Sequence, residues 1–361
     1  MRPVESAGPG LHCGGQMSGR PRACILSVSG SDLLADEASL LADMQPWAVI
    51  LMGRSFVTRD QVRRLVDNIW AALDRPCLIF VDQEGGRVAR LKPPEWPVFP
   101  SGQAYGDLFE RDEAAGLEAA WLGHRLIANE LAQMNIHANC APVLDLRFDG
   151  AHQIVGDRAL GNSVEAIARL ARASLEGLRD GGVAGVIKHM PGHGRALVDS
   201  HEDLPRVTAG DNELSQDFAS FSALVDAPMA MTAHIAYDAF DADAPATLSK
   251  TVISEVIRNR IGFDGLLMTD DLGMKALGGT LADRARGAIG AGCDTVLHCS
   301  GFVKEADVIL AEMREVAEAV PELDGKALAR AKYAQAFATL DRTFDAQAGW
   351  ERFSELLGVA A

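Results

Sequence analysis

The chain has 361 residues, of which 48% are hydrophobic and 23% are charged, a composition typical of a globular protein with a large core. Its formal net charge of −16 argues against a nucleic-acid partner, because binding phosphates requires clustered lysine and arginine. The acidity and the lack of any apolar run near the ~20 residues of a membrane helix also argue against a membrane partner.

The beginning of the chain and its cysteines bear on location. Residues 1–22 are rich in Gly, Pro and Ser and lack the apolar core of a secretory signal, so we expect a flexible lead-in. The six cysteines form no CxxC pair, and Cys77, Cys140, Cys293 and Cys299 lie in or beside apolar runs. This pattern suits reduced, buried thiols, and we expect a cytoplasmic protein.

Strand-like and helix-like segments alternate along the chain. Short apolar runs predict strands at 23–29, 47–52, 77–82, 136–143, 184–189, 228–234, 265–270 and 294–299. Helical patterns fit residues 60–73, 113–134, 164–181, 250–261, 282–292, 304–319 and 326–342. About eight such repeats predict a single α/β domain, a (β/α)8 barrel over residues 23–345, with a C-terminal extension at 346–361. A doubly wound open sheet is the alternative, but SGSDLLADE after the first strand contains no GxGxxG turn.

Charged and imidazole side chains stand where the predicted strands end. They are Arg54, Asp82, Lys188, His189, His234, Asp270 and Asp271. Each one alone could be a solvated loop residue, but active sites of barrels gather at this end of the strands. The segment KHMPGHGRALVDSHEDLP, residues 188–205, carries three of the nine histidines and is broken by glycine and proline. We therefore predict that it is a long active-site loop after the fifth strand.

Four motifs in this order resemble the family 3 glycoside hydrolases: VDQEGGRVARL (81–91), KHMPGHG (188–194), DSH (199–201) and TDDLGM (269–274). The likeness is greatest to the bacterial β-N-acetylhexosaminidases of that family and extends from about residue 24 to about residue 340. It implies a cytoplasmic enzyme of peptidoglycan recycling that removes terminal N-acetylglucosamine from muropeptides, cutting the bond to 1,6-anhydro-N-acetylmuramic acid. Met190 and Gly273 depart from the family's usual Phe and Ser.

The resemblance and the chemistry together suggest catalytic roles. A retaining glycosidase needs a carboxylate nucleophile and a proton donor. Asp270, at the end of an apolar strand, is the expected nucleophile, although an Asp there could also cap a helix. Asp271 would point the other way and serve the structure. The resemblance assigns the acid/base role to His201 with Asp199 as its support, a pair that could otherwise be a polar feature of a solvated loop.

Other residues are expected to bind the sugar. Asp82 can accept hydrogen bonds from vicinal hydroxyls, and a Lys188–His189 pair at the end of a buried strand needs a polar partner. The resemblance adds Arg90 and Arg158 as substrate contacts. Arg54 and His234 are expected to line the mouth of the barrel. We expect no cofactor and no metal, a muropeptide containing N-acetylglucosamine as the partner, and a monomer or weak oligomer.

Several alternatives remain open at this point. A His acid/base leaves room for phosphate in place of water, hence for a β-glucosaminide phosphorylase, and another β-glycosidase specificity is equally open. A metal-dependent barrel hydrolase could use His189, His193, Asp199 and His201, but the early HxH of such enzymes does not occur. A silent sugar-binding protein would not need Asp270, Asp199 and His201 together.

Overall fold

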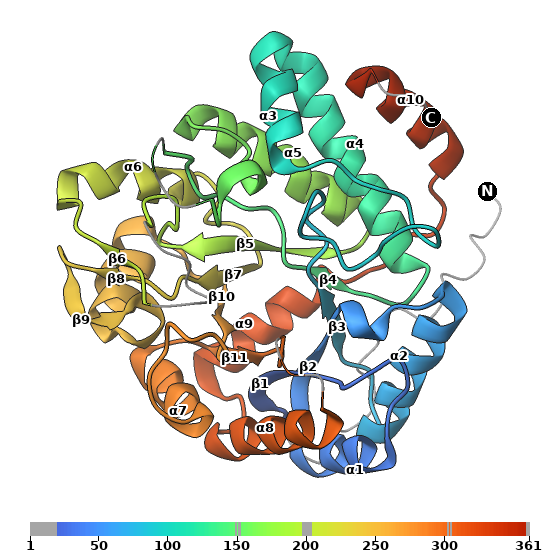
Figure 1. Ribbon diagram of the computed structural model, residues 1–361, viewed down its shortest axis with the longest axis vertical. Helices are drawn as coiled ribbons and strands as arrows, with labels where there is room; N and C mark the ends of the chain where they lie inside the picture. Colours follow the sequence, from blue (N-terminus) through green and yellow to red (C-terminus); the bar gives the residue numbers. More distant parts are fainter. Residues whose placement is uncertain are drawn as a thin grey trace, which may run out of the picture.

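The computed structural model describes residues 20–148, 150, 153–196, 204–301, 303 and 305–358. Eight parallel strands close into a barrel in the order β1-β11-β10-β7-β5-β4-β3-β2 (Figure 1). They are β1 (Arg22–Ser27), β2 (Pro46–Leu51), β3 (Leu78–Val81), β4 (Ala138–Asn139), β5 (Ala184–Met190), β7 (Met229–Thr232), β10 (Leu266–Asp271) and β11 (Thr295–His298). Each overlaps one predicted strand, so the predicted (β/α)8 barrel is confirmed.

The barrel closes between the first and last strands. Leu26 of β1 pairs with Val49 of β2 on one side and with His298 of β11 on the other. Strands such as PWAVIL and LIFV are buried along their whole length. They face side chains inside the barrel and helices outside it, which is why they are continuously apolar instead of alternating. An open doubly wound sheet is therefore excluded.

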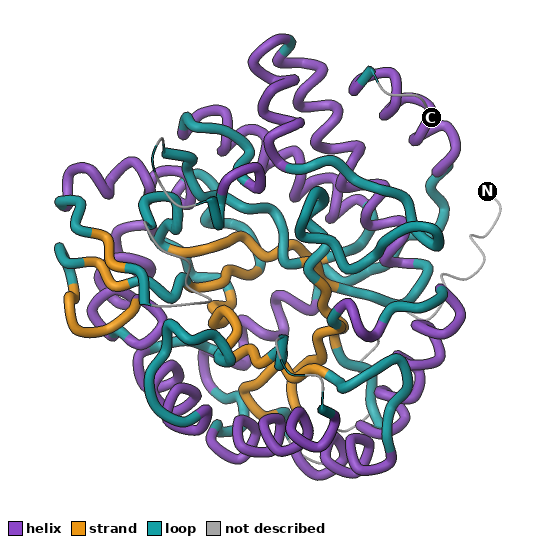
Figure 2. The backbone as a smooth tube through the Cα atoms, viewed as in Figure 1, coloured by secondary structure: helices purple, strands orange, loops and turns teal. Residues whose placement is uncertain are grey.

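Helices form a ring around the strands (Figure 2). In chain order they are α1 (Ala35–Met44), α2 (Arg59–Leu73), α3 (Gly102–Arg111), α4 (Glu113–Ala132), α5 (Val164–Asp180), α6 (Asp211–Ser222), the π-helix η4 (Val252–Ile261), α7 (Leu281–Ala291) and α8 (Ala306–Ala319). Side chains cap several N-termini: Thr58 accepts from the Gln61 amide and Ser163 from the Ala166 amide. Helices α1, α3 and α6 were not predicted.

The segment after α8 closes the amino-terminal end of the barrel. Helix α9 (Gly325–Gln335) lies behind the strands in Figure 1, and Arg330 pairs there with Asp264 and Asp294. The Leu323 amide donates a hydrogen bond to the Pro21 carbonyl, and the Asp341 amide donates one to the Gly181 carbonyl. The predicted helix at 326–342 therefore ends early, because the chain turns to bond the strand starts.

The C-terminal helix α10 (Ala346–Leu357) packs on the outside of α4, beside it in Figure 1. Phe353 is buried there, with its ring 6.3 Å from that of Tyr105. None of the helices within the described ranges is long and apolar enough to cross a bilayer. The proposed lead-in at 1–22 lies outside the described residues except for its last three positions.

The opposite end of the barrel carries long loops. They follow β3 at residues 82–101, β4 from residue 140 and β5 from residue 191. A small sheet of β6 (Arg206–Val207), β8 (Ala236–Tyr237) and β9 (Asp241–Pro245) lies beside the β5 end. Because all eight barrel strands are parallel, their carboxyl ends meet under these loops and bring distant parts of the sequence to one place.

Candidate active site

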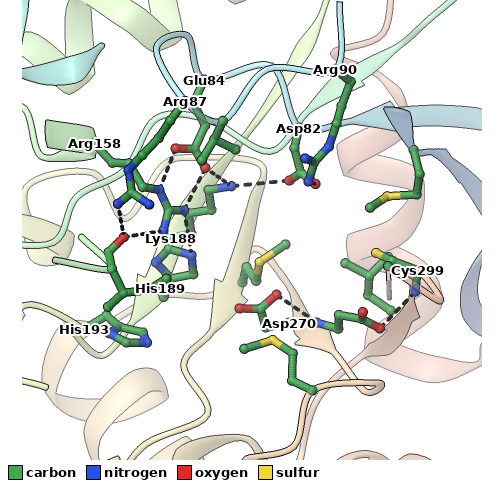
Figure 3. A pocket seen from close by; sticks show the side chains of 18 residues that line it. Asp82, Glu84, Arg87, Arg90, Arg158, Lys188, His189, His193, Asp270 and Cys299 are labelled. Carbon is green, nitrogen blue, oxygen red and sulfur yellow. Dashed lines mark hydrogen bonds and ion pairs between the residues drawn. The ribbon is translucent and has the colours of Figure 1, made fainter. Parts of the chain in front are cut away.

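A cavity of about 290 Å³ opens at the carboxyl end of the barrel (Figure 3). Its polar lining comes from the loops after β3 and β4 and from the ends of β5 and β10: Asp82, Glu84, Arg87, Arg90, Arg158, Lys188, His189, His193, Asp270 and Asp271. Its apolar lining includes Met52, Val88, Met231, Met274 and Leu297. A concave site with convergent polar groups and apolar walls is the usual form of a small-ligand site.

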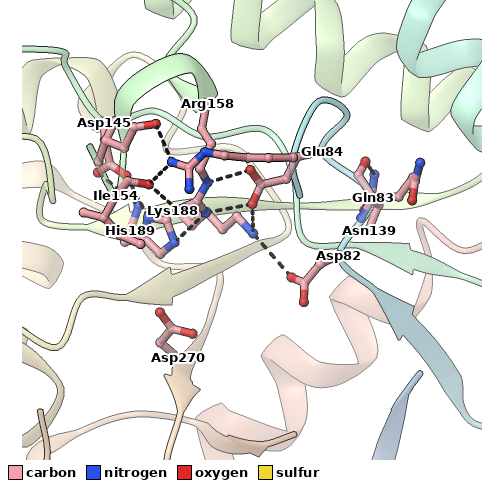
Figure 4. A network of polar contacts seen from close by, with 12 residues as sticks. Asp82, Gln83, Glu84, Asn139, Asp145, Ile154, Arg158, Lys188, His189 and Asp270 are labelled. Carbon is pink, nitrogen blue, oxygen red and sulfur yellow. Dashed lines mark hydrogen bonds and ion pairs between the residues drawn. The ribbon is translucent and has the colours of Figure 1, made fainter. Parts of the chain in front are cut away.

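Glu84 is the centre of the polar cluster. Its Oε1 lies 2.6 Å from Lys188 Nζ, and the Arg158 guanidinium donates to both of its oxygens at 2.8 Å (Figure 4). Burial alone would raise the pKa of Glu84, but the charges of Arg158 and Lys188 hold that pKa well below its ordinary value. For Lys188, the nearby carboxylates outweigh burial and raise its pKa. All three groups are therefore ionised at neutral pH.

Asp82 joins this cluster to Arg90. Its Oδ2 accepts from Arg90 Nη2 at 2.9 Å, and its Oδ1 lies 3.4 Å from Lys188 Nζ. Burial would raise the pKa of Asp82, but Lys188 and Arg90 lower it overall. This wall therefore offers carboxylate oxygens as hydrogen-bond acceptors and cationic N–H groups as donors. Vicinal sugar hydroxyls require both.

His189 is held from behind by Asp145, whose side chain is fully buried. The His189 Nδ1 lies 2.7 Å from Asp145 Oδ2, and the His193 amide donates to Asp145 Oδ1 at 2.7 Å. The other ring nitrogen, Nε2, lies 3.4 Å from Arg158 Nη2. The peptide bond between Lys188 and His189 is cis, and both side chains line the cavity. Asp145 therefore fixes the orientation in which the imidazole faces the ligand space.

Asp270 lies at the end of β10, apart from the linked cluster in Figures 3 and 4. Its Oδ1 accepts a hydrogen bond of 2.8 Å from the Asp271 amide. It forms no ion pair with any residue that the structure describes, so its carboxylate faces the cavity without a neutralising cation. The alternative role as a helix cap is wrong, because Thr280 caps the next helix, α7.

Asp271 turns toward the protein interior, as its place in the strand predicted. Its Oδ1 accepts from the Cys299 amide at 2.9 Å and from the Gly273 amide at 3.0 Å. Burial would raise its pKa, but His298 and these amides lower the pKa to about 2. Asp271 therefore remains a carboxylate and anchors the β10 end to the β11 end.

The structure places two of the expected mouth residues outside the cavity lining. Arg54, in the 3₁₀ turn η1 (Gly53–Ser55), donates to Val28, Ser300 and Cys299 carbonyls and to the Ser27 hydroxyl. These bonds direct its guanidinium to the ends of β1 and β11. His234 is buried between Thr247 Oγ1, at 2.7 Å, and the Asp271 carbonyl, at 3.0 Å. Both support the wall of the cavity from behind.

The expected acid/base pair, His201 and Asp199, lies outside the described residues, which break off at 196 and resume at 204. Within the described ranges, no group of three or more His, Cys, Asp or Glu side chains is arranged to hold a metal ion.

Glu84 in the cavity and Asp145 behind it escaped the sequence analysis, although signals for them existed. Glu84 follows Asp82 by two positions, and residues i and i+2 of an extended segment share a face. Asp145 lies shortly after the fourth predicted strand, an end of the barrel strands for which we proposed no charged residue. The expected sugar-binding residues, Asp82, Arg90, Arg158, Lys188 and His189, do converge on one cavity.

Residues 23–332 match the model of the glycosyl hydrolase family 3 N-terminal domain, which is most of the chain. The chain belongs to this family. The family and the names of the relatives below confirm the predicted enzyme class, a glycoside hydrolase of the β-N-acetylhexosaminidase type.

The relatives of this family 3 hydrolase include named β-hexosaminidases and solved structures. It is 40% identical over 284 residues to a β-hexosaminidase of Alkalilimnicola ehrlichii, covering 76% of this chain and 80% of the relative. A β-hexosaminidase of Bordetella parapertussis is 37% identical over 287 residues, 78% of this chain and 80% of its own. NagZ of Neisseria gonorrhoeae, solved with N-trifluoroacetyl-D-glucosamine, is 30% identical with a TM-score of 0.82, covering 95% of this chain and 99% of its own.

Proposed function

We propose that this family 3 hydrolase removes terminal β-linked N-acetylglucosamine from muropeptides, cutting the bond to 1,6-anhydro-N-acetylmuramic acid during peptidoglycan recycling in the cytoplasm. The observation that supports a sugar substrate is the polar cluster of Asp82, Glu84, Lys188 and Arg158. Its cavity has a volume of about 290 Å³, which is small enough to favour one sugar ring. The gonococcal complex with an N-acylglucosamine analogue supports the same ligand class.

The reaction we propose has two steps. In the first, Asp270 attacks the anomeric carbon and a covalent bond forms between them, while the bond to the leaving oxygen breaks and His201 gives that oxygen a proton. In the second, His201 removes a proton from water, the water oxygen attacks the same carbon, and Asp270 is released. Asp199 would hold the His201 ring in the required tautomer.

The polar cluster would hold the sugar ring through its hydroxyls. Because its four charges are already paired with one another, it needs no counter-ion from the substrate and can bind a neutral sugar. The pairs also fix these side chains before substrate arrives, so little ordering entropy is lost on binding. Asp270, which lacks such a cation, keeps its negative charge available for the oxocarbenium-like transition state.

Hydrolysis of chromogenic glycosides by the purified enzyme tests the sugar specificity. We expect turnover of 4-nitrophenyl N-acetyl-β-glucosaminide and far slower turnover of the β-glucoside. A preference for the glucoside would refute the assignment. Turnover that a chelator abolishes and Zn²⁺ restores would favour the metal-dependent alternative instead.

Mass spectrometry of the products from purified muropeptides tests the natural substrate and the acceptor. We expect free N-acetylglucosamine and a 1,6-anhydromuramoyl peptide, with or without phosphate in the buffer. An N-acetylglucosamine 1-phosphate product would instead identify a phosphorylase. Muropeptides left intact by an enzyme that cleaves the chromogenic substrate would show that the natural aglycone is different.

A further inference from the structure

A second buried cluster of charges lies behind the Asp270 wall, away from the sugar-binding cluster. Its members are Asp271 on β10, His298 on β11 and Glu312 on α8, which we call the His298 cluster. His298 Nδ1 lies 3.3 Å from Asp271 Oδ1, and His298 Nε2 lies 3.0 Å from Glu312 Oε2. The Ser300 hydroxyl lies 2.9 Å from His298 Nε2 and donates to Glu312 at 2.7 Å. The imidazole itself is fully buried.

This cluster is one residue away from the proposed nucleophile. The Asp271 amide donates the 2.8 Å hydrogen bond that orients the Asp270 carboxylate. The same residue carries the Asp271 side chain, which accepts hydrogen bonds from the Cys299 and Gly273 amides and lies within ion-pair distance of His298. Asp271 therefore links the two residues, and a change in the charge of His298 would alter the hydrogen bond that orients Asp270.

We propose that His298 is a positioning residue, whose imidazolium holds the Asp271 carboxylate and through it the amide that orients Asp270 for attack. The proposal rests on the function proposed above, in which Asp270 is the nucleophile. It adds a dependence of the first chemical step on the protonation of a residue that does not touch the substrate.

The charged groups around His298 decide when it holds its proton. Asp271 from β10 and Glu312 from α8 face it directly. Arg54 from η1 interacts with both of these carboxylates, and Arg284 from α7 interacts with Asp271. Burial would lower the pKa of His298, but the two carboxylates outweigh it and raise the pKa to about 9. Because this pKa lies well above neutrality, His298 keeps its proton at pH 7, and the positioning effect is lost as the pH rises through about 9.

Gly273 provides the space that this arrangement requires. A Cβ atom at that position would lie 3.3 Å from both Asp271 carboxylate oxygens and 3.4 Å from His298 Cε1, closer than most side-chain contacts. An alanine there would require the carboxylate to move away from the new Cβ atom by a few tenths of an ångström. Gly273 therefore leaves room for both the Asp271 carboxylate and the His298 imidazole.

The test is the rate at which a fluorinated N-acetylglucosaminyl fluoride labels Asp270, measured from pH 6 to 10. Fluoride leaves with little help from an acid, so this rate reports the nucleophile and not His201. For the wild type we expect labelling that slows about tenfold as the pH passes about 9. For His298→Gln we expect a rate about tenfold lower already at pH 7 and no further fall near pH 9.

A second variant covers the case in which His298→Gln does not fold. Glu312→Gln removes one of the two carboxylates, so the fall of the labelling rate should move to lower pH by about one unit. His137→Gln is the matched control, because it removes another buried histidine from the opposite end of the barrel and should leave the profile unchanged.

The failures are distinguishable. Wild-type enzyme that is not labelled at Asp270 at any pH would refute the proposed function. Labelling at Asp270 that is as fast in His298→Gln as in the wild type, or a midpoint that Glu312→Gln does not move, would refute the role of His298 alone.

Discussion

The carboxylate of Glu84 lies 2.6 Å from the ammonium group of Lys188, and this contact joins the β3 loop to the end of β5 across the mouth of the barrel. The same carboxylate accepts two hydrogen bonds from Arg158 in the loop after β4. One buried carboxylate thus contacts two cations. It sets the positions of groups on three consecutive barrel units that we expect to touch the sugar.

Replacing Glu84 with Gln should therefore damage both stability and binding. Two cations would lose the carboxylate that contacts them both, and breaking buried ion pairs in this way costs about 3–5 kcal/mol. We expect the free energy of unfolding to fall by that amount in urea denaturation, and KM for the chromogenic substrate to rise.

Glu118→Gln is the matched control for that change. Glu118 pairs with Arg352 on the protein surface, and both side chains are more than 40% exposed. Such pairs contribute roughly 0–1 kcal/mol. A loss in Glu84→Gln no larger than that in Glu118→Gln would show that the cluster does not need Glu84.

Asp271 should contribute an acid-sensitive part of the stability. Its folded pKa of about 2 lies below the ordinary 3.8, so its contribution is complete above about pH 4 and is lost as the pH falls through about 2. That difference corresponds to about 2 kcal/mol. The stability gap between the wild type and Asp271→Asn should therefore narrow by about this amount between pH 5 and pH 2. A gap that stays constant in urea denaturation over this range would contradict the assignment.

Much of the barrel was predictable because its strands are continuous apolar runs. All eight were found, and α2, α4, α5, α7 and α8 followed from their periodicity. Helices α1, α3 and α6 were missed because their mixed apolar and charged residues give no long helical pattern. The early end of α9 at Gln335 depends on long-range hydrogen bonds that no local pattern encodes.

The site was predictable only in part. Charged residues at strand ends led to Asp82, Lys188, His189 and Asp270. Arg54 stands at a similar place, but its guanidinium is bonded to carbonyls behind the cavity, a direction that sequence cannot show. His298 was missed because a lone histidine inside an apolar strand carries no signal until Asp271 and Glu312 are seen beside it.

Asp270→Ala should abolish turnover with little effect on folding. The Asp270 carboxylate accepts a single hydrogen bond from the Asp271 amide and pairs with no described cation, so its loss removes little stability. Loss of a nucleophile should lower kcat by roughly a thousandfold or more. Azide, a small external nucleophile, should restore part of the activity and yield a glycosyl azide. Near wild-type turnover without azide would contradict the role of Asp270.

Changes at His201 and Asp199 should be non-additive, because we expect the two to act as one acid/base unit. His201→Ala should slow hydrolysis of a substrate with a poor leaving group far more than one with a reactive leaving group, which needs little protonation. Comparison of kcat/KM for a phenyl and a dinitrophenyl glycoside, in the two single variants and the double variant, measures both effects. Equal losses on the two substrates would exclude His201 as the acid.

The acetamido group of the substrate offers a rival nucleophile. Enzymes that use it usually orient it with a pair of carboxylates, whereas Asp270 is the carboxylate that faces the cavity without a cation. We therefore expect a thiazoline that mimics the cyclised acetamido intermediate to inhibit weakly. Inhibition much tighter than substrate binding would favour attack by the substrate's own acetamido oxygen.

The most direct test of Asp270 as the nucleophile is the mass of the intact enzyme after reaction with a mechanism-based fluorosugar, followed by peptide mapping. We expect an increase of one fluoroglycosyl group per chain, located on the peptide that contains Asp270 and absent from Asp270→Ala. A label on any other residue, or an unlabelled enzyme that continues to hydrolyse N-acetylglucosaminides, would refute the covalent path through Asp270.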